Sequence, residues 1–199
     1  SFNFGAHMNT LLAVIVAISF QNICDKDDRQ YTNQYNGAFD VSYSWVQFNA
    51  SPVARVGGCS ATLIDNSTII TASHCDIRMG DFAYFNDAIG EFPTEYWVAE
   101  KLEDDWWYDF AIFRLNKDPS GDFGIRTMTE HSPELGAEIY LIGHPQGNPL
   151  TISAGPLVGL THHDAQYKAD TLGGSSGAGV LDSEGRMFAL HQRGSCKDG

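Results

Sequence analysis

From Phe39 onward, short runs of apolar and β-branched residues alternate with turns rich in Gly, Pro, Asn and Asp. This pattern is typical of the strands of β-sandwiches and β-barrels. A stretch with several Gly and Pro, residues 117–133, separates two sets of runs and is expected to be a linker. The chain is therefore expected to form two β-rich halves without a long amphipathic helix. The runs predict strands at 41–48, 58–64, 68–72, 96–102 and 110–115, and a second set at 138–142, 150–153, 156–160, 179–181 and 186–191.

The chain begins differently, with consecutive apolar residues at 11–18 that read LLAVIVAI. A membrane-spanning helix needs ~20 such residues, so no transmembrane segment is expected. The run fits the apolar part of a secretory signal or a pro-segment, which we place at residues 1–21, with cleavage near residues 20–23. The alternative is a short buried strand. In the first interpretation, a chain that retains residues 1–21 is a zymogen or a signal-bearing precursor.

The composition narrows the classes of function. Apolar residues make up 43% of the 199 residues, which is typical of a globular protein. Asp and Glu number 25 against 12 Lys and Arg, so the formal net charge is −13. A phosphate backbone would repel a chain this acidic, and we expect no nucleic-acid partner.

The four cysteines include no C-x-x-C pair, and no histidines lie at the spacing of a zinc site. They are more typical of disulfides, which form in oxidising compartments outside the cytosol. The chain is therefore expected to be secreted. We also expect a monomer that needs no metal and no cofactor.

Three short segments carry side chains that can act together in a reaction. His74 follows an apolar strand, and Asp109 opens another, where a buried carboxylate needs a partner. The third segment, GGSSGAG at 173–179, is too rich in glycine for a strand and, taken alone, could also be a flexible turn. A phosphate-binding loop fits less well, because no Lys-Ser or Lys-Thr follows. Together the segments supply a base, an orienting carboxylate, a serine nucleophile and glycines that let backbone amides turn towards an oxyanion.

These segments resemble those of the serine endopeptidases of the trypsin/chymotrypsin fold. GGCSATLI at 57–64 and TASHC at 71–75 are similar to that family's histidine segment, and GSSG at 174–177 is similar to its Gly-x-Ser-Gly loop. The resemblance covers about residues 28–194. It implies an all-β fold of two antiparallel six-stranded β-barrels with the active site in the cleft between them, and a protein or peptide as substrate.

The resemblance also implies domain bounds. The protease domain would take residues 22–199, after the leader at 1–21. Within it, the first barrel would span about residues 22–116 and the second about 134–199, on either side of the linker.

The same resemblance implies a role for each residue of the site. His74 would act as general base and then as acid, and Asp109 would orient it. Ser176, and not Ser175, would be the nucleophile, with the amides of Gly174 and Ser176 as oxyanion-hole donors.

Within this fold, the chain is most similar to bacterial glutamyl endopeptidases. The turn IGHP at 142–145 and the segments around Thr171 and His191 carry this resemblance. It implies that Thr171 and His191 bind the carboxylate of a substrate glutamate. Asp170, however, stands six residues before Ser176, where an enzyme that selects Lys or Arg carries its acidic residue. Cleavage after Lys or Arg therefore stays open as the alternative.

Cys59 and Cys75 fall on the family's disulfide, which leaves Cys24 and Cys196 as a second pair by elimination. The family adds a strand and a helix after the position of His191, whereas few residues follow it here. Either the chain is truncated, or its second barrel closes differently. A catalytically inactive binding protein on the same scaffold is a further alternative, although all three catalytic residue types are present.

Overall fold

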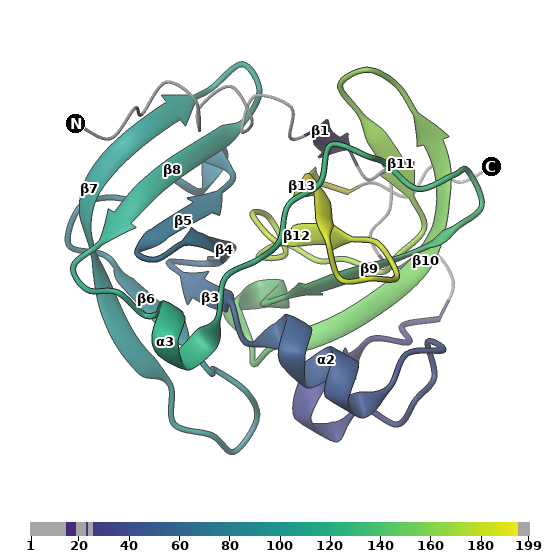
Figure 1. The fold of residues 1–199 in the computed structure, drawn as a ribbon, viewed down its shortest axis with the longest axis horizontal. Coiled ribbons are helices and arrows are strands. Elements are labelled where there is room, and N and C mark those ends of the chain that lie inside the picture. Colours follow the sequence, from purple (N-terminus) through teal and green to yellow (C-terminus); the bar gives the residue numbers. More distant parts are fainter. Residues whose placement is uncertain (1–14, 19–22, 24–25, 195–199) are drawn as a thin grey trace.

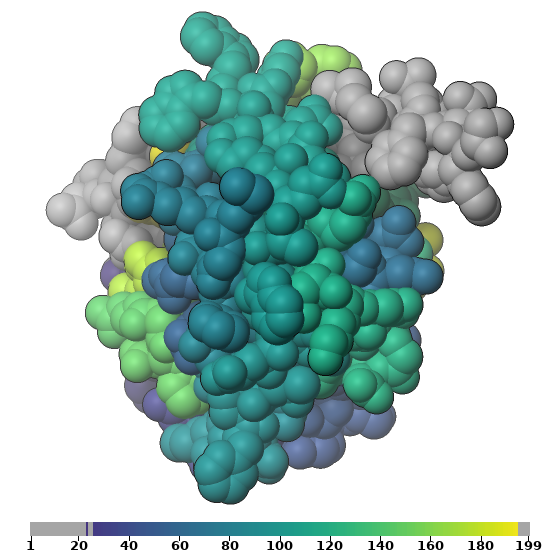
Figure 2. Space-filling view, turned by 90° about the vertical axis from the view of Figure 1, so that its left-hand side faces the viewer, coloured from purple at the N-terminus to yellow at the C-terminus, as the bar shows by residue number. Residues whose placement is uncertain are grey.

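Six strands close into a barrel in the order β3-β4-β5-β8-β7-β6, on the left of Figure 1. The computed structural model describes residues 15–18, 23 and 26–194. Alternate side chains of the strands point inwards and form a core that includes Leu63, Ile69, Phe85 and Phe113. Figure 2 shows the molecule from this side, where the teal segments of the barrel cover much of the face. The strands are β3 (Val53–Val56), β4 (Cys59–Asp65), β5 (Thr68–Thr71), β6 (Phe82–Phe85), β7 (Thr94–Asp105) and β8 (Phe110–Leu115).

Within the described residues, the second half forms a seven-stranded sheet that is not closed, so the expected second six-stranded barrel is not confirmed. Its order is β1-β13-β12-β9-β10-β11, with β2 paired to β10. β1 pairs in parallel with the edge of β13, and no ladder joins β1 to β11 among the described residues. The strands are β1 (Ile15–Ile18), β2 (Gln30–Tyr31), β9 (Glu138–Gly143), β10 (Thr151–Leu160), β11 (Ala165–Tyr167), β12 (Gly179–Leu181) and β13 (Met187–Arg193).

β1 is the described part of the leader predicted at residues 1–21. The rest of that segment lies outside the described residues. Where the sequence predicts two strands at 150–153 and 156–160, the structure has the single strand β10. It runs through Gly155, where a Cβ would lie 2.5 Å from the backbone of Lys168, so only glycine fits.

An apolar core joins the two halves. Ile70 and Ile112 from the barrel share one cluster with Ile142 and Leu190 from the open sheet. β9 contributes to two cores, because its alternate side chains point to opposite faces and both faces are covered. This explains why its sequence is an uninterrupted apolar run rather than an alternating one.

The strand predicted at 41–48 is wrong, because the chain forms helix α2 (Tyr43–Ala50) there. Aromatic and β-branched residues favour a strand in this segment. The structure overrides that preference in two ways. The Ser42 side chain accepts a hydrogen bond from the Trp45 amide and caps the helix, and Val46 and Ala50, one turn apart, are buried in the shared core.

Within the described residues, no helix is both long and apolar enough to cross a membrane.

The remaining elements are short. The strands β2, β3, β6 and β11 lie in segments where the hydrophobic pattern predicts no strand. The short helices are η1 (Thr32–Gln34), η2 (Ser73–Cys75), α3 (Ser120–Phe123) and η3 (Pro145–Gly147).

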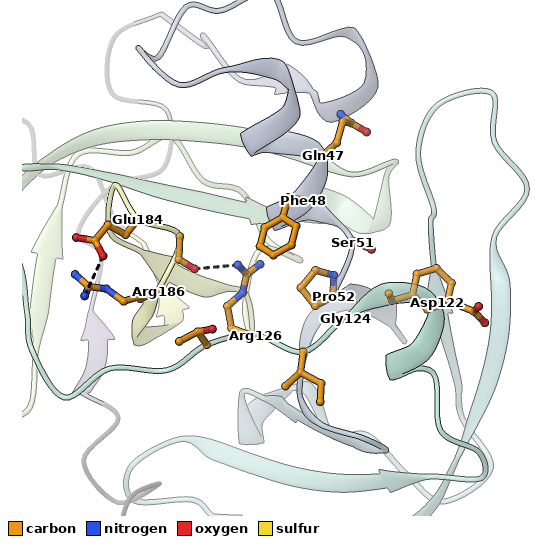
Figure 3. Close-up of a pocket in the computed structure, with 13 residues that line it drawn as sticks. Gln47, Phe48, Ser51, Pro52, Asp122, Gly124, Arg126, Glu184 and Arg186 are labelled. Atoms are coloured by element: carbon orange, nitrogen blue, oxygen red, sulfur yellow. Dashed lines mark hydrogen bonds and ion pairs between the residues drawn. The ribbon is translucent and has the colours of Figure 1, made fainter.

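Arg126, in the connection between the two halves, is buried and forms no ion pair with a carboxylate among the residues that the structure describes (Figure 3). It donates hydrogen bonds to the Oδ1 and the backbone O of Asn49 and, at 3.1 Å, to the backbone O of Gly185. Asn49 belongs to the last turn of α2, where the helix dipole favours a cation. Burial lowers the pKa of Arg126 to about 10, so the group stays charged at neutral pH. Arg126 therefore ties the connection to α2 and to the turn before β13.

We expect Arg126→Met to lower the free energy of unfolding by about 2 kcal/mol, because three buried acceptors lose their donor. Urea denaturation measures this change. Arg78→Met is the matched control, since Arg78 is exposed and paired with Asp76, and it should change stability by less than about 0.5 kcal/mol. An Arg126→Met variant as stable as the wild type would show that the hydrogen bonds of Arg126 do not stabilise the fold.

Candidate active site

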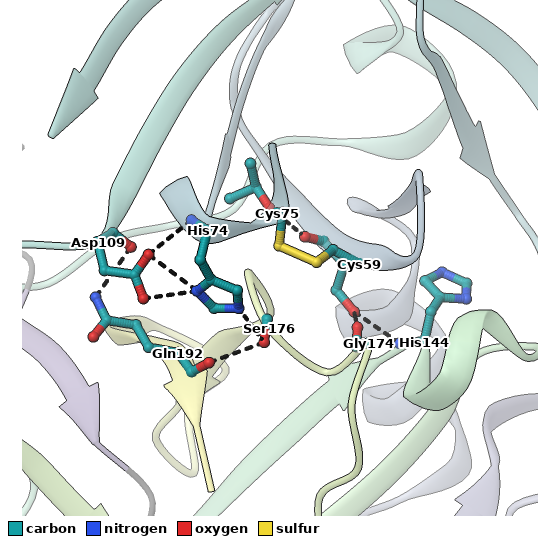
Figure 4. The surroundings of a disulfide bond; sticks show 10 residues. Cys59, His74, Cys75, Asp109, His144, Gly174, Ser176 and Gln192 are labelled. Atoms are coloured by element: carbon teal, nitrogen blue, oxygen red, sulfur yellow. Dashed lines mark hydrogen bonds and ion pairs between the residues drawn. A yellow bond between two sulfur atoms is a disulfide. The ribbon is translucent and has the colours of Figure 1, made fainter. Parts of the chain in front are cut away.

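His74, Asp109 and Ser176 come from separate segments and meet in one hydrogen-bonded chain (Figure 4). His74 lies in η2 after β5, Asp109 directly precedes β8, and Ser176 lies in the loop before β12. Nδ1 of His74 is 2.8 Å from Oδ2 of Asp109, and Nε2 is 3.0 Å from Oγ of Ser176. The structure thus brings together the three residues that the sequence singles out.

The carboxylate of Asp109 holds His74 from two directions. It accepts a hydrogen bond from the His74 backbone amide at 2.9 Å as well as facing Nδ1 of the ring. A carboxylate at Nδ1 keeps the proton on that nitrogen, which leaves Nε2 free to accept one from a serine hydroxyl. Asp109 itself adopts φ = +52°, a left-handed conformation that is uncommon outside glycine.

Two glycines shape the serine loop. Gly174 and Gly177 have φ of +94° and +85°. A Cβ at Gly174 would lie 2.6 Å from the backbone O of His144, and one at Gly177 would lie 2.1 Å from the backbone O of Ser60. Within the described part of the chain, the amides of Gly174 and Ser176 donate to no protein acceptor. They are therefore available to an oxygen that gains negative charge.

Ser60 on β4 connects the barrel to the serine loop, a role that the sequence does not reveal. Its amide donates to the backbone O of Ser176, and its Oγ donates to the backbone O of Gly174, each at 2.8 Å. The only sequence signal is a small polar residue inside an apolar strand. Ser175 instead turns towards its own loop, where its Oγ accepts a hydrogen bond from the Leu172 amide at 3.4 Å.

The disulfide between Cys59 and Cys75 is present and joins β4 to η2, next to His74 (Figure 4). The two Cα atoms lie 6.1 Å apart. The second predicted pair, Cys24 with Cys196, lies outside the described residues.

His191 is buried on β13, with its Nδ1 2.5 Å from the hydroxyl of Tyr167. Burial lowers the pKa of His191 to about 3, and nearby His74 acts in the same direction. Burial raises the pKa of Tyr167 well above its usual range, so the hydroxyl stays protonated beside Nδ1 of the neutral His191 ring. Tyr167 is a further residue that sequence reasoning missed.

The other two predicted specificity residues differ in their environment. Thr171 is buried, and Asp170 is half-buried. Oδ2 of Asp170 accepts a hydrogen bond from the backbone amide of Asp28 at 3.2 Å. Burial raises the pKa of the Asp170 carboxyl. The hydrogen bond from the Asp28 amide opposes this shift, whereas the carboxylates of Asp28 and Asp27 add to it.

A cleft of about 460 Å³ opens beside the catalytic side chains. His74, Asp109, Trp106, Gln192 and Arg193 line it. The cleft therefore adjoins the base and its carboxylate, and Ser176 is hydrogen-bonded to the base. A nucleophile, a base and two free amides together can transfer an acyl group.

Comparison with known proteins agrees with this chemistry. A family model described as a trypsin-like peptidase domain matches residues 59–190. Among solved structures, the serine endoprotease from Yersinia pestis has a TM-score of 0.64 at 16% identity, covering 75% of this chain and 57% of that one. The inactive form of the Rv3671c protease has a TM-score of 0.58 at 16% identity, covering 71% of this chain and 77% of that one. At these identities the likeness shows the fold.

Curated relatives are larger proteins. The chain is 24% identical to secreted RxLR effector protein 73 of Plasmopara viticola, over 89% of this chain and 52% of the effector. It is 26% identical to the pro-apoptotic serine protease NMA111 of Saccharomyces cerevisiae, over 85% of this chain and 19% of that protease. Protease Do-like 7 of Arabidopsis thaliana is 30% identical over 42% of this chain and 10% of its own length. The chain thus spans about half of the first relative and much less of the other two.

Two buried histidines near the site make folding depend on pH. His144 has its Nδ1 3.0 Å from the backbone O of Asn148, and burial lowers its pKa to about 4. The pKa of His191 is lowered to about 3. Below pH 6.5, the unfolded chain binds protons at both positions, whereas the folded chain does not. Above pH 6.5 both histidines are neutral in the folded and the unfolded chain, so they do not change the free energy of unfolding. As the pH falls below 6.5 towards 4 and 3, protonation of the unfolded chain lowers this free energy.

Between pH 6.5 and the lowered pKa of each histidine, we expect the free energy of unfolding to fall by about 1.4 kcal/mol per histidine for each unit by which the pH is lowered. Urea denaturation at a series of pH values measures the slope. His144→Gln should remove about half of this contribution, and His131→Gln, at an exposed position, should remove none. An unchanged slope in His144→Gln would contradict the assignment.

Proposed function

The chain belongs to the family of trypsin-like peptidase domains, which are serine endopeptidases, and we propose that it hydrolyses peptide bonds through an acyl-enzyme formed on Ser176. The observation that carries this proposal is the hydrogen-bonded chain from Asp109 through His74 to Ser176. The free amides of Gly174 and Ser176 support it.

The proposed mechanism assigns one task to each group. His74 Nε2 takes the proton of Ser176 Oγ as the oxygen attacks the substrate carbonyl, and Asp109 stabilises the imidazolium that forms. The amides of Gly174 and Ser176 donate to the oxyanion of the tetrahedral intermediate. His74 then gives its proton to the leaving amine. A water molecule, activated by the same imidazole, releases the acyl group in the reverse order of steps.

Ser176→Ala should reduce peptide hydrolysis by at least about 10⁴-fold, because the attacking oxygen is lost. Turnover of casein by the pure protein measures the effect. Ser175→Ala is the matched control and should stay within a few-fold of the wild type, since its hydroxyl faces its own loop. Inactive Ser175→Ala with active Ser176→Ala would reverse the assignment, and a wild type without turnover would favour a binding protein.

The proposal extends to cleavage after glutamate. If the Tyr167 hydroxyl donates to Nδ1, the neutral His191 ring carries a hydrogen on Nε2 and is suited to donate to a carboxylate. Thr171 would supply a hydroxyl. Asp170, the candidate for selecting Lys or Arg, already accepts a hydrogen bond from the Asp28 amide, which disfavours that alternative.

Cleavage-site profiling on a peptide library should show a preference for Glu before the cleaved bond. His191→Gln should reduce this preference by about tenfold or more, because a charge-assisted hydrogen bond is lost. Asp170→Asn should leave it unchanged. Cleavage after Lys or Arg that disappears in Asp170→Asn would contradict the glutamate proposal and support the alternative.

Secretion is also part of the proposal. A disulfide beside the catalytic histidine suits an oxidising compartment, and a relative from Plasmopara viticola is named a secreted effector. We further propose that the protein acts as a monomer on protein or peptide substrates.

A further inference from the structure

The turn that carries Asp109 has little packing of its own. It follows β7 and contains Trp106 and Trp107, whose side chains are 75% and 88% exposed. The carboxylate of Asp105 accepts hydrogen bonds from the amides of Trp107 and Tyr108, each at 2.9 Å, and so holds the start of the turn. The turn ends at Asp109, which adopts a left-handed backbone.

Gln192 reaches this turn from the other half of the molecule. It lies on β13 and is 1% exposed. Its Nε2 donates to the backbone O of Tyr108 at 2.5 Å and to the backbone O of Asp109 at 3.1 Å. Figure 4 shows the Gln192 side chain alongside Asp109, with its amide directed at that backbone.

The main chain of the same residue touches the serine. The backbone O of Gln192 lies 2.9 Å from Ser176 Oγ and His74 Nε2 lies 3.0 Å from it, so the two acceptors compete for the single hydroxyl hydrogen. Gln192 therefore contacts the residues on both sides of His74. Its side chain fixes the carboxylate partner, and its main chain lies against the nucleophile.

We propose that Gln192 is a positioning residue, whose side-chain amide holds the backbone of Asp109 in its left-handed conformation across the junction of the two halves. This inference rests on the proposed function of His74, Asp109 and Ser176. Without the amide, two carbonyl groups lose their donor and the turn can relax towards ordinary backbone angles. The Asp109 carboxylate would then swing away from Nδ1 of His74.

A displacement of about 1 Å in such a site can reduce turnover about 100-fold while the substrate still binds. The loss should therefore fall on kcat and leave KM within about twofold. Gln192→Met keeps the length of the side chain and removes the donor. Gln192→Glu also removes the donor and places a negatively charged carboxylate against two carbonyl oxygens, which repel it. It should therefore lower kcat more than Gln192→Met at neutral pH.

The test measures kcat and KM per active site, titrated with a fluorophosphonate, on a peptide chosen from the cleavage profile. We expect kcat to fall about 10- to 100-fold in Gln192→Met. As the pH is lowered, the protonated carboxyl of Gln192→Glu regains a donor, so its activity should rise relative to that of Gln192→Met at the same pH. Gln47→Met is the matched control, because it removes a similar bond, 2.7 Å from Nε2 to the backbone O of Thr32, away from the site. It should keep the wild-type kcat.

Proton NMR gives a readout that does not need turnover. The hydrogen on Nδ1 of His74 that bonds Asp109 should resonate at low field in the wild type, and this signal should move upfield or broaden away in folded Gln192→Met. A wild-type kcat per titrated site, or an unchanged low-field signal, would overturn the inference. Because the signal is read without substrate, an inactive wild type would refute the proposed function while the role of Gln192 is still tested.

Discussion

The hydrogen bonds of His74 are the interaction on which the rest of the structure depends, because the two partners of the ring belong to different halves of the molecule. Asp109 directly precedes β8 of the closed barrel, and Ser176 lies in the loop before β12 of the open sheet. A catalytic constellation has to be held within about 0.5 Å of its productive geometry. The barrel and the sheet must therefore keep a nearly fixed relative position, although neither contains the whole site.

Two kinds of interaction meet this requirement. The shared apolar core, with Ile112 from the barrel and Leu190 from the sheet, favours contact between the halves but is not directional. Direction comes from buried polar groups that cross the junction. Ser60 binds the serine loop from β4, Arg126 binds both α2 and the turn before β13, and Gln192 binds the turn before β8 from β13. Each donates to backbone carbonyl groups of a segment that is distant in the chain.

Much of the site could be predicted from the sequence because its groups stand next to strong local signals. His74 follows an apolar strand and precedes a cysteine, Asp109 opens an apolar strand, and Ser176 lies among glycines. Short apolar runs predicted four of the six barrel strands but not β3 and β6, and the barrel itself was expected only from the family resemblance. The helix at Tyr43–Ala50 was not predicted, because its residues favour strands and only the Ser42 cap and the packing of one face reverse that preference.

The contacts that hold the site could not be predicted, since they join residues far apart in the chain. Gln192 reaches back to Tyr108 and Asp109, and Ser60 to the serine loop, without any local pattern that marks them. The parallel pairing of β1 with β13 is similar, because strand periodicity carries no information about the partner.

The most direct measurement is peptide mapping of the wild-type chain after reaction with a fluorophosphonate, which locates the nucleophile by mass spectrometry. We predict that the label lies on Ser176 alone, and that His74→Ala greatly slows its attachment because the base is gone. A label on Ser175, or no label on the folded protein, would contradict the proposal that the Asp109–His74–Ser176 chain is catalytic.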